Sequence, residues 1–313
     1  MFAILFCYMN LRHLAVFHAI AQSGSISGGA ARLFLSQPAA SRELGELERR
    51  LGLDLFDRIP RGVRLTEAGQ LLYDYAKRIF ALEQAAETAL EELADLRRGR
   101  LAVGASSTIG MYVLPARVAE FRRRYPGIDL TLEVGNTRAV EEHLLEHRVA
   151  LGFIEGPITS DACEVQLFTH DEIVAVAAAD HPLAARNKVE PTELEHLPVV
   201  LREAGSGTRV IVKEALKAHG LGLAETLSMG STESIKRAVI AGAGIAWLSE
   251  LCIADELAAG TLIVLPVRGL HIKRPLHVMW LKDTRLTPAT HAFLELLGLR
   301  RNLSGIAALH TDS

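Results

Sequence analysis

The sequence predicts an all-α N-terminal region that ends near residue 98 and a larger α/β region after it. Three observations carry this prediction. Apolar residues recur at helical spacing through most of the first region, and strand patterns alternate with helix patterns beyond Arg100. The chain of 313 residues is also long enough for two or three domains, and 49% hydrophobic with 23% charged residues is an ordinary globular composition.

Charge is distributed unevenly along the chain. The formal net charge is −3, yet residues 10–78 hold ten basic and seven acidic residues, so the remainder is acidic. A small basic end on an acidic body indicates one module that faces nucleic acid, and it excludes a protein that is basic throughout. Cys7, Cys163 and Cys252 are far apart and form no C-x-x-C, which indicates neither a disulfide framework nor a zinc knuckle and favours a reducing cytoplasm.

The opening MFAILFCYM is apolar, but it has no basic segment or cleavage site and is shorter than the roughly 20 residues of a membrane span. We therefore expect no membrane partner. MNLRHLAVFHAIAQSG reads as a complete start, so we expect the native chain to begin at Met9, with an extra turn on the first helix as the alternative.

Three short helices are expected at residues 11–22, 26–34 and 37–51. SGS at 23–25 ends the first helix and caps the second. Ser36 is expected to cap the third, with Pro38 in the first turn, where a missing N–H costs little. Two helices joined by so tight a turn form a helix-turn-helix, and the outward Gln37, Ser41 and Arg42 suit a DNA major groove. The alternative is a solvated helical hairpin.

Residues 55–69 read as two strands joined by a Pro/Gly turn that carries arginines. An Arg-rich turn beside a reading helix can enter the minor groove, so this hairpin predicts a basic wing.

The stretch SGSISGGAARLFLSQPAASRELGELERRLGLDLFDRIPRGVRLTEAG resembles the winged helix-turn-helix of LysR-type transcriptional regulators, and the match runs without a gap from Asn10 to about Arg98. Gly28 and Gly29 depart from the family pattern and cost about 1 kcal/mol each against alanine, so we expect a softer second helix. Together, the side chains and the resemblance assign promoter-DNA contacts to Ser36, Gln37, Pro38, Ala39, Ser41, Arg42, Arg58, Arg61 and Arg64.

A long helix is expected after Thr66, because apolar residues continue at spacings of three and four. A single helix would leave this stripe exposed, so it predicts a dimer through a coiled-coil linker, as the resemblance also implies. The alternative is that the stripe packs on its own domain. The expected seam consists of Leu72, Tyr75, Ile79, Leu82, Ala86, Ala89, Leu93 and Leu96.

Beyond residue 99 the strand–helix alternation predicts a parallel sheet, and the region resembles the family's effector-binding domain, with two lobes like those of periplasmic binding proteins. We expect the chain to cross between lobes near 165–172 and 268–274. The expected organisation is a winged helix-turn-helix at 9–66, a linker helix at 67–98, an effector domain at 99–302 (lobe I 99–168 and 272–302; lobe II 169–271) and a tail at 303–313.

Hydroxyls, glycines and arginines gather where strands of this region end and helices begin, which suits an anion between the lobes. Each cluster alone is also explained as an ordinary helix cap. The family resemblance places the effector at the first Ser/Thr cluster. The predicted effector contacts are Ser106, Ser107, Thr108, Thr137, Arg202, Glu203, Ser206, Thr208, Arg209, Ser231 and Thr232.

The REAGSGTR loop resembles that of family members that govern carbon fixation and sulfur-compound metabolism, so we expect a sulfur oxyanion or a phosphorylated or carboxylated metabolite. Further expected partners are a second copy of the chain, a tetramer built as a dimer of dimers, and RNA polymerase.

HLLEH at 143–147 has zinc-protease spacing, with two histidines on one helix face, but a solvated helix face explains it more simply. No nucleophile motif is present, so we expect neither an enzyme nor a cofactor or metal. The alternative function is an anion-binding protein whose N-terminal helices serve assembly alone.

Overall fold

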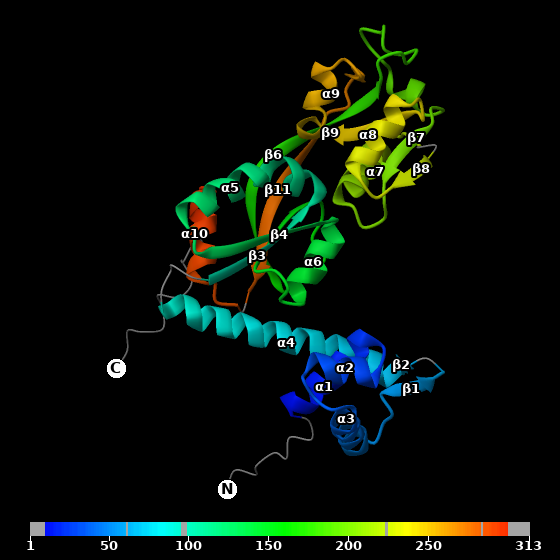
Figure 1. Ribbon diagram of the computed structural model, residues 1–313. Coiled ribbons are helices and arrows are strands. Elements are labelled where there is room, and N and C mark those ends of the chain that lie inside the picture. Colours follow the sequence, from blue (N-terminus) through cyan, green and yellow to red (C-terminus); the bar gives the residue numbers. More distant parts are fainter. Residues whose placement is uncertain (1–9, 61, 95–98, 223–224, 283, 300–313) are drawn as a thin grey trace. The chain divides into compact units, whose positions relative to one another are not determined.

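The computed structural model describes residues 10–60, 62–94, 99–222, 225–282 and 284–299 (Figure 1). The chain divides into two compact units, Met1–Glu87 and Thr88–Ser313, and the boundary falls inside the long helix α4. The all-α start and the α/β body expected from the sequence are both confirmed.

The first unit is a three-helix bundle with a hairpin and the start of a long helix. Gly24, in the left-handed region, ends the first helix, and Ser25 and Ser36 each accept a backbone N–H as N-caps of the next two. The core holds Leu14, Phe17 and Leu47. The elements are α1 (Leu11–Ser23), α2 (Ile26–Arg32), α3 (Gln37–Leu51), β1 (Phe56–Ile59), β2 (Gly62–Leu65) and α4 (Glu67–Ala94).

The two glycines of α2 have a packing reason that the sequence did not reveal. A Cβ on Gly29 would lie 2.6 Å from the backbone nitrogen of Ile20, and a Cβ on Gly28 would lie 2.8 Å from the Ser25 hydroxyl. Because α1 and α2 approach this closely, alanine does not fit at Gly29 without movement of backbone. The close packing of α1 on α2 therefore requires glycine at these positions.

The turn between α2 and α3 holds its one non-glycine residue of positive φ at Phe34, with φ 55. Its side chain is 97% exposed, so no burial offsets the cost of the left-handed backbone. Gly62 ties the hairpin to the bundle, since the Val63 N–H donates to the Gly24 carbonyl at 2.9 Å and a Cβ on Gly62 would lie 2.3 Å from that oxygen.

The predicted coiled-coil seam is wrong at its start. Leu72 and Ile79 pack against the core of the first unit, because the first turns of α4 complete that core. Tyr75 and Leu82 are exposed as predicted, while the side chains of Ala89, Leu93 and Leu96 lie outside the described part. The large apolar side chains that α4 does expose, as far as it is described, are Leu71, Tyr75, Leu82 and Leu90.

The second unit is built on one sheet with strand order β4-β3-β5-β11-β6-β9-β7-β8, and β10 also pairs with β6. The strands are β3 (Gly99–Ser106), β4 (Ile128–Gly135), β5 (Leu151–Glu155), β6 (Cys163–Ala178), β7 (Val199–Arg202), β8 (Glu225–Met229), β9 (Ile245–Ser249), β10 (Leu262–Val264) and β11 (Ile272–Leu281). The helices are η1 (Ile109–Val113), α5 (Leu114–Arg124), α6 (Thr137–Leu145), η2 (Pro191–Leu194), α7 (Gly207–Ala218), α8 (Thr232–Ile240), η3 (Glu250–Cys252), α9 (Ala254–Ala258) and α10 (Pro288–Leu296).

The sheet is mixed and not purely parallel. The βαβ units predicted from the sequence are parallel, as in β3 with β4 and β5, and in β7 with β8 and β9. The long strands β6 and β11 run antiparallel to each other and to their neighbours. β6 is a single long strand of 16 residues, from Cys163 to Ala178, and it contains the whole of the crossing expected near 165–172.

The long strands connect two lobes with separate cores. One core contains Phe121, Phe153 and Phe293, and another contains Val212, Ile245 and Trp247. β6 pairs with β11 from Cys163 to Ile173 and with β9 from Ile173 to Val176, so the chain passes between lobes along β6 and returns along β11 (Figure 1).

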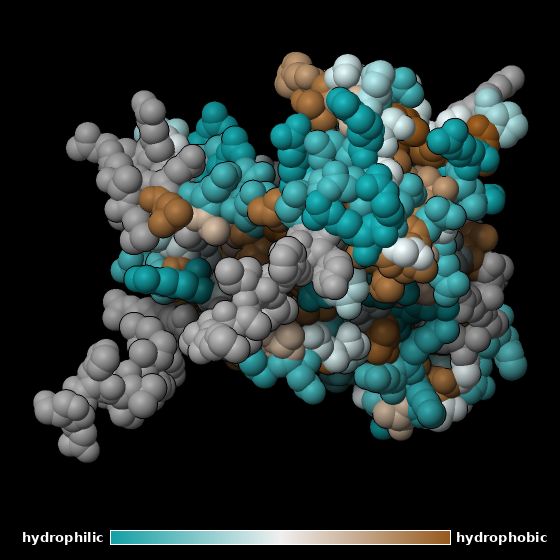
Figure 2. Space-filling view, turned by 90° about the horizontal axis from the view of Figure 1, so that it is seen from below, coloured by the Kyte–Doolittle hydropathy of each residue, from teal (hydrophilic) through white to brown (hydrophobic). Residues whose placement is uncertain are grey.

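On the face drawn in Figure 2, hydrophilic residues predominate and the apolar ones form separate small patches.

Candidate functional site

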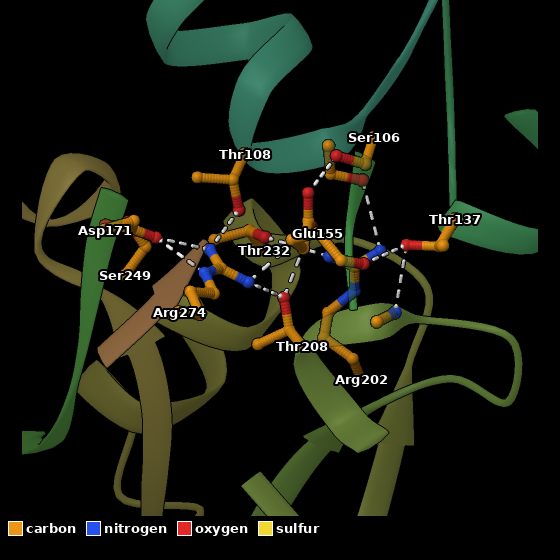
Figure 3. Close-up of polar contacts among 12 residues, drawn as sticks. Ser106, Thr108, Thr137, Glu155, Asp171, Arg202, Thr208, Thr232, Ser249 and Arg274 are labelled. Atoms are coloured by element: carbon orange, nitrogen blue, oxygen red, sulfur yellow. Dashed lines mark hydrogen bonds and ion pairs between the residues drawn. The ribbon is translucent and has the colours of Figure 1, made fainter. Parts of the chain in front are cut away.

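The strand ends of the two lobes meet at a buried polar cluster (Figure 3). Ser106 ends β3 and Glu155 ends β5 in one lobe, while Arg202 ends β7 and Thr208 lies in the first turn of α7 in the other. All four side chains are at most 5% exposed. The convergence of strand ends and helix starts expected from the sequence is therefore present, and it forms the contact between the lobes.

Arg202 joins β7 to the opposite lobe. Its Nε donates to Glu203 at 2.8 Å, while its Nη2 donates to the Ser107 hydroxyl at 3.1 Å. Nη1 lies 3.4 Å from Thr232 at the start of α8. Burial raises the pKa of Glu203, but the hydrogen bonds and the charge of Arg202, together with smaller contributions from the backbone and from Asn136, outweigh burial and hold that pKa below its ordinary 4.5. The arginine is 4% exposed and is compensated by a carboxylate from its own chain.

Arg274 lies deepest and bonds to both lobes. It is 1% exposed, and its Nε donates to Asp171 at 2.7 Å. Nη1 donates to the Thr208 hydroxyl at 2.7 Å, and Nη2 donates to the Thr108 hydroxyl at 3.1 Å. Ser249 donates to the second oxygen of Asp171 at 2.8 Å. This network ties the crossing strands to the first turn of α7 and to the residue before η1.

The carboxylate of Glu155 sits among donors from both lobes. One oxygen accepts a short hydrogen bond from the Ser106 hydroxyl. The other accepts from the Thr208 hydroxyl at 3.4 Å and lies 3.7 Å from Nη1 of Arg274. The backbone carbonyl of Glu155 accepts from Thr137 at 2.7 Å.

Two glycines let the lobes touch through backbone. A Cβ on Gly207 would lie 1.7 Å from the Glu155 carbonyl oxygen, and a Cβ on Gly156, whose φ is 100, would lie 2.7 Å from the Gly207 Cα. The close approach that these glycines allow is between the backbones of the two lobes.

A second contact between the lobes lies beside this cluster. Tyr112, in the π-helical segment η1, donates to Glu233 in α8 and accepts from Lys236 at 3.2 Å. Lys236 is 4% exposed and also lies 2.8 Å from Glu256. Burial and the bond to Glu233 raise the pKa of the Tyr112 phenol, so it stays neutral.

Seven predicted effector residues therefore meet in the cluster: Ser106, Ser107, Thr108, Thr137, Arg202, Thr208 and Thr232. Four are placed at its edge. Glu203 bonds Arg202, and Arg209 donates to the Arg202 carbonyl at 2.7 Å. Ser206 and Ser231 stand before α7 and α8 without a side-chain capping bond.

Sequence reasoning missed Glu155, Asp171, Ser249 and Arg274. The sequence marks the three charged residues among them, because a charged residue inside an apolar strand pattern needs a buried partner. Glu155 closes LGFIE, and Asp171 and Arg274 occupy facing positions of the crossing strands. Which charges pair, however, depends on a register between strands about a hundred residues apart.

The predicted DNA-contacting residues lie around the start of α3 and along the hairpin. Ser36, Gln37 and Arg42 are exposed, as is Pro38, while Ala39 and Ser41 are half-buried. Arg58 is exposed on β1, and Arg64 on β2 lies 3.6 Å from Asp57. Arg61 lies outside the described residues.

The HLLEH motif does not have the geometry that zinc spacing requires. α6 ends at Leu145, and His147 follows it with φ 57, so the two histidines do not share a helix face. His143 instead lies 3.0 Å from Glu133. Within the described ranges, no group of three or more His, Cys, Asp or Glu residues could hold a metal ion. No helix in the part of the chain that is described is long and apolar enough to cross a membrane.

Comparison with known proteins identifies both units. Residues 11–70 match the model for a "Bacterial regulatory helix-turn-helix protein, lysR family", and residues 94–300 match that for a "LysR substrate binding domain". The transcriptional regulator YeiE of Escherichia coli (strain K12) is 40% identical over 92% of this chain and 97% of its own. The transcriptional activator CmpR of Synechocystis is 33% identical over 92% and 94%.

Two solved structures add to this. The regulatory domain of CcmR from Synechocystis, in complex with 2-PG, is 31% identical, with a TM-score of 0.60 over 65% of this chain and 98% of that one. Full-length CbnR in complex with its target DNA shares the fold, with a TM-score of 0.70 at 21% identity over 93% and 99%. The chain therefore belongs to the LysR family of DNA-binding transcriptional regulators, with an N-terminal helix-turn-helix and a C-terminal effector-binding domain.

Proposed function

We propose that this LysR-type regulator is controlled by a small anionic effector, either a sulfur oxyanion or a phosphorylated or carboxylated metabolite, bound between the two lobes. The observation that carries the proposal is the meeting of two buried arginines with hydroxyls from both lobes at the polar cluster. Hydroxyls and free N–H groups at helix starts are donors that an oxyanion can accept from. The 2-PG complex of the related CcmR regulatory domain supports a ligand of this kind.

The effector would act by changing the angle between lobes. Arg202 and Arg274 are held by carboxylates and hydroxyls of the protein itself. An anion that took some of these donors would replace contacts between lobes, and the two arrangements would differ in affinity for the anion. A coupling of about 1–3 kcal/mol is enough for regulation of this type.

For the DNA-facing side, we propose that Gln37, Ser41 and Arg42 read base edges in the major groove, while Arg58, Arg61 and Arg64 of the hairpin contact phosphates or the minor groove. Ser36, Pro38 and Ala39 would position the helix start. Half-sites of an imperfect palindrome would be read by a dimer joined through the exposed apolar side chains of α4, and two dimers would form a tetramer.

The DNA interface is tested by binding to DNA from the chain's own upstream intergenic region, measured over a salt series. Arg42→Ala is expected to weaken specific binding by about 1–3 kcal/mol. Arg49→Ala, an exposed arginine in the last turn of the same helix, is the matched control and should bind nearly as wild type. Equal losses for both variants would remove Arg42 from the base-reading set.

The effector is tested by calorimetry of the full-length protein with inorganic phosphate, sulfite, sulfate and a phosphate monoester, and by repeating the DNA titration with each anion. Heat of binding together with a shift in DNA affinity is the expected result. Absence of heat with every anion in the panel would contradict the proposed effector class.

A further inference from the structure

The carboxylate of Glu155 stands at the centre of the proposed anion site. We propose that Glu155 determines its specificity, by requiring that the bound oxyanion share one proton with this carboxylate. The site would accept a protonatable oxyanion, such as a phosphate or hydrogen sulfite, and reject sulfate. This inference rests on the proposed anionic effector and names its chemical class.

Geometry places any anion at these donors beside Glu155. Ser106 Oγ is hydrogen-bonded to one carboxylate oxygen, and Thr208 Oγ1 lies 3.4 Å from the other (Figure 3). An anion oxygen that accepted from either hydroxyl would therefore come within a few ångströms of a Glu155 oxygen. The residue is 1% exposed, so water does not screen the repulsion between the two.

The two buried arginines of the cluster are already partly neutralised by carboxylates of the protein, which weakens their ability to offset that repulsion. Arg274 is the cation that faces Glu155, at 3.7 Å, and it already holds Asp171 at 2.6 Å. The second buried arginine of the cluster, Arg202, is compensated by Glu203. The other described groups that face Glu155 are neutral: Ser106 from β3, Thr208 from α7 and the Thr137 hydroxyl from α6 at its carbonyl.

Two negative groups at hydrogen-bond distance in a buried site cannot both stay fully ionised, so one of them keeps a proton. The proton comes from the ligand or from solvent and lies between a ligand oxygen and a Glu155 oxygen, and no covalent bond other than O–H is made or broken. A phosphate monoester, with a second pKa of about 6, keeps such a proton available near neutrality. Sulfate is fully ionised there and has no proton to share, so it can bind only if Glu155 takes up a proton from solvent.

Phosphate and sulfate form the matched test, because both are tetrahedral oxyanions of similar size, but only phosphate carries a proton near neutral pH. Calorimetry on the full-length wild-type protein is expected to show phosphate or sulfite bound at least about 100-fold more tightly than sulfate. Titrations of sulfite or a phosphate monoester in two buffers of different ionisation enthalpy should show proton uptake that grows as the pH rises above the ligand pKa.

Glu155→Gln removes the charge and keeps the shape. In this variant the preference over sulfate is expected to fall to within about tenfold, and the proton uptake to disappear. Glu155→Asp keeps the carboxylate and should keep the preference for phosphate or sulfite over sulfate. It is also the variant to measure if Glu155→Gln fails to fold. Glu141→Gln is the matched control, since Glu141 is 5% exposed and accepts from the backbone N–H groups of Thr159 and Ser160, neither of which belongs to the cluster.

The outcomes separate the two proposals. If no anion binds the wild-type protein, the proposed effector class fails and this inference fails with it. If anions bind but sulfate competes equally with phosphate and sulfite, or if Glu155→Gln leaves the preference unchanged, the effector class stands and the role of Glu155 is overturned.

Discussion

Replacing Arg274 by methionine should destabilise the effector domain more than any single surface change. The arginine is 1% exposed and holds Asp171, Thr208 and Thr108 at once. Methionine fills much of the same volume but provides no donor, so Asp171 and Glu155 would stay buried without their cation. A buried charge pair that loses one partner typically costs about 3–5 kcal/mol, and we expect a loss in this range.

The assay is urea unfolding followed by tryptophan fluorescence. The chain has two tryptophans, Trp247 and Trp280, and both lie in the effector domain, one in each lobe core. With a urea slope of about 2 kcal/mol per molar, a loss of 3–5 kcal/mol lowers the midpoint by roughly 1.5–2.5 M. The slope itself should stay unchanged.

A double variant checks the mechanism. Arg274→Met with Asp171→Asn removes the cation and one of the carboxylates that depend on it, so the double variant should be more stable than the sum of the two single losses predicts. If Arg274→Met costs under about 1 kcal/mol, or if the two losses are simply additive, the buried ion network is not what joins the crossing strands to the lobes.

Three further predictions concern single positions. Gly29→Ala should destabilise the first unit because the added Cβ would lie 2.6 Å from the Ile20 backbone, whereas Gly45→Ala, whose Cβ would meet nothing within 4 Å, should stabilise α3 by about 0.5–1 kcal/mol. Thermal unfolding followed by circular dichroism measures both changes, and a shift of the melting temperature in the same direction for both variants would contradict this reasoning. Phe34→Asn should relieve the left-handed backbone and raise amide protection of α2 and α3 by about 1 kcal/mol, while Leu53→Asn, also exposed, should not. Because the pKa of Glu203 is below 4.5 in the folded chain, its stabilising contribution is present above about pH 4.5 and is lost as the pH falls through the lowered value. Glu203→Gln should therefore reduce the loss of unfolding free energy at acid pH. If the pH dependence of the variant equals that of the wild type, the pair with Arg202 does not contribute as argued.

Local chemistry made most element positions readable from the sequence. The caps at Ser25 and Ser36 follow from short-range rules on capping and periodicity, and they are found where expected. The hydroxyl clusters were found for the same reason, because a residue that ends a strand and begins a helix is visible in the sequence.

Contacts between residues that are distant in the sequence could not be predicted from it. Leu72 and Ile79 fit an intermolecular seam as well as an intramolecular core, and only the packing of α4 on its own domain decides between them. The pairing of Arg274 with Asp171 depends on the register of two strands that are distant in sequence. Glu155 stands out as a charged residue at the end of an apolar strand, but the sequence does not show which groups of the other lobe pair with it.

The two strands that connect the lobes, β6 and β11, also constrain how the lobes can move against each other. Between Leu276 and His277 the register of β11 against β6 shifts, and Phe168 is the extra residue on β6. A two-stranded ribbon resists stretching through its hydrogen bonds but twists about its long axis, and a bulge concentrates that twist. We therefore expect rotation of the lobes against each other to be easier than their separation. Under the proposed effector control, the domain would report ligand binding as an angle between the lobes. The β6–β11 pairs that neither β5 nor β9 flanks would then set how much ligand energy each degree requires.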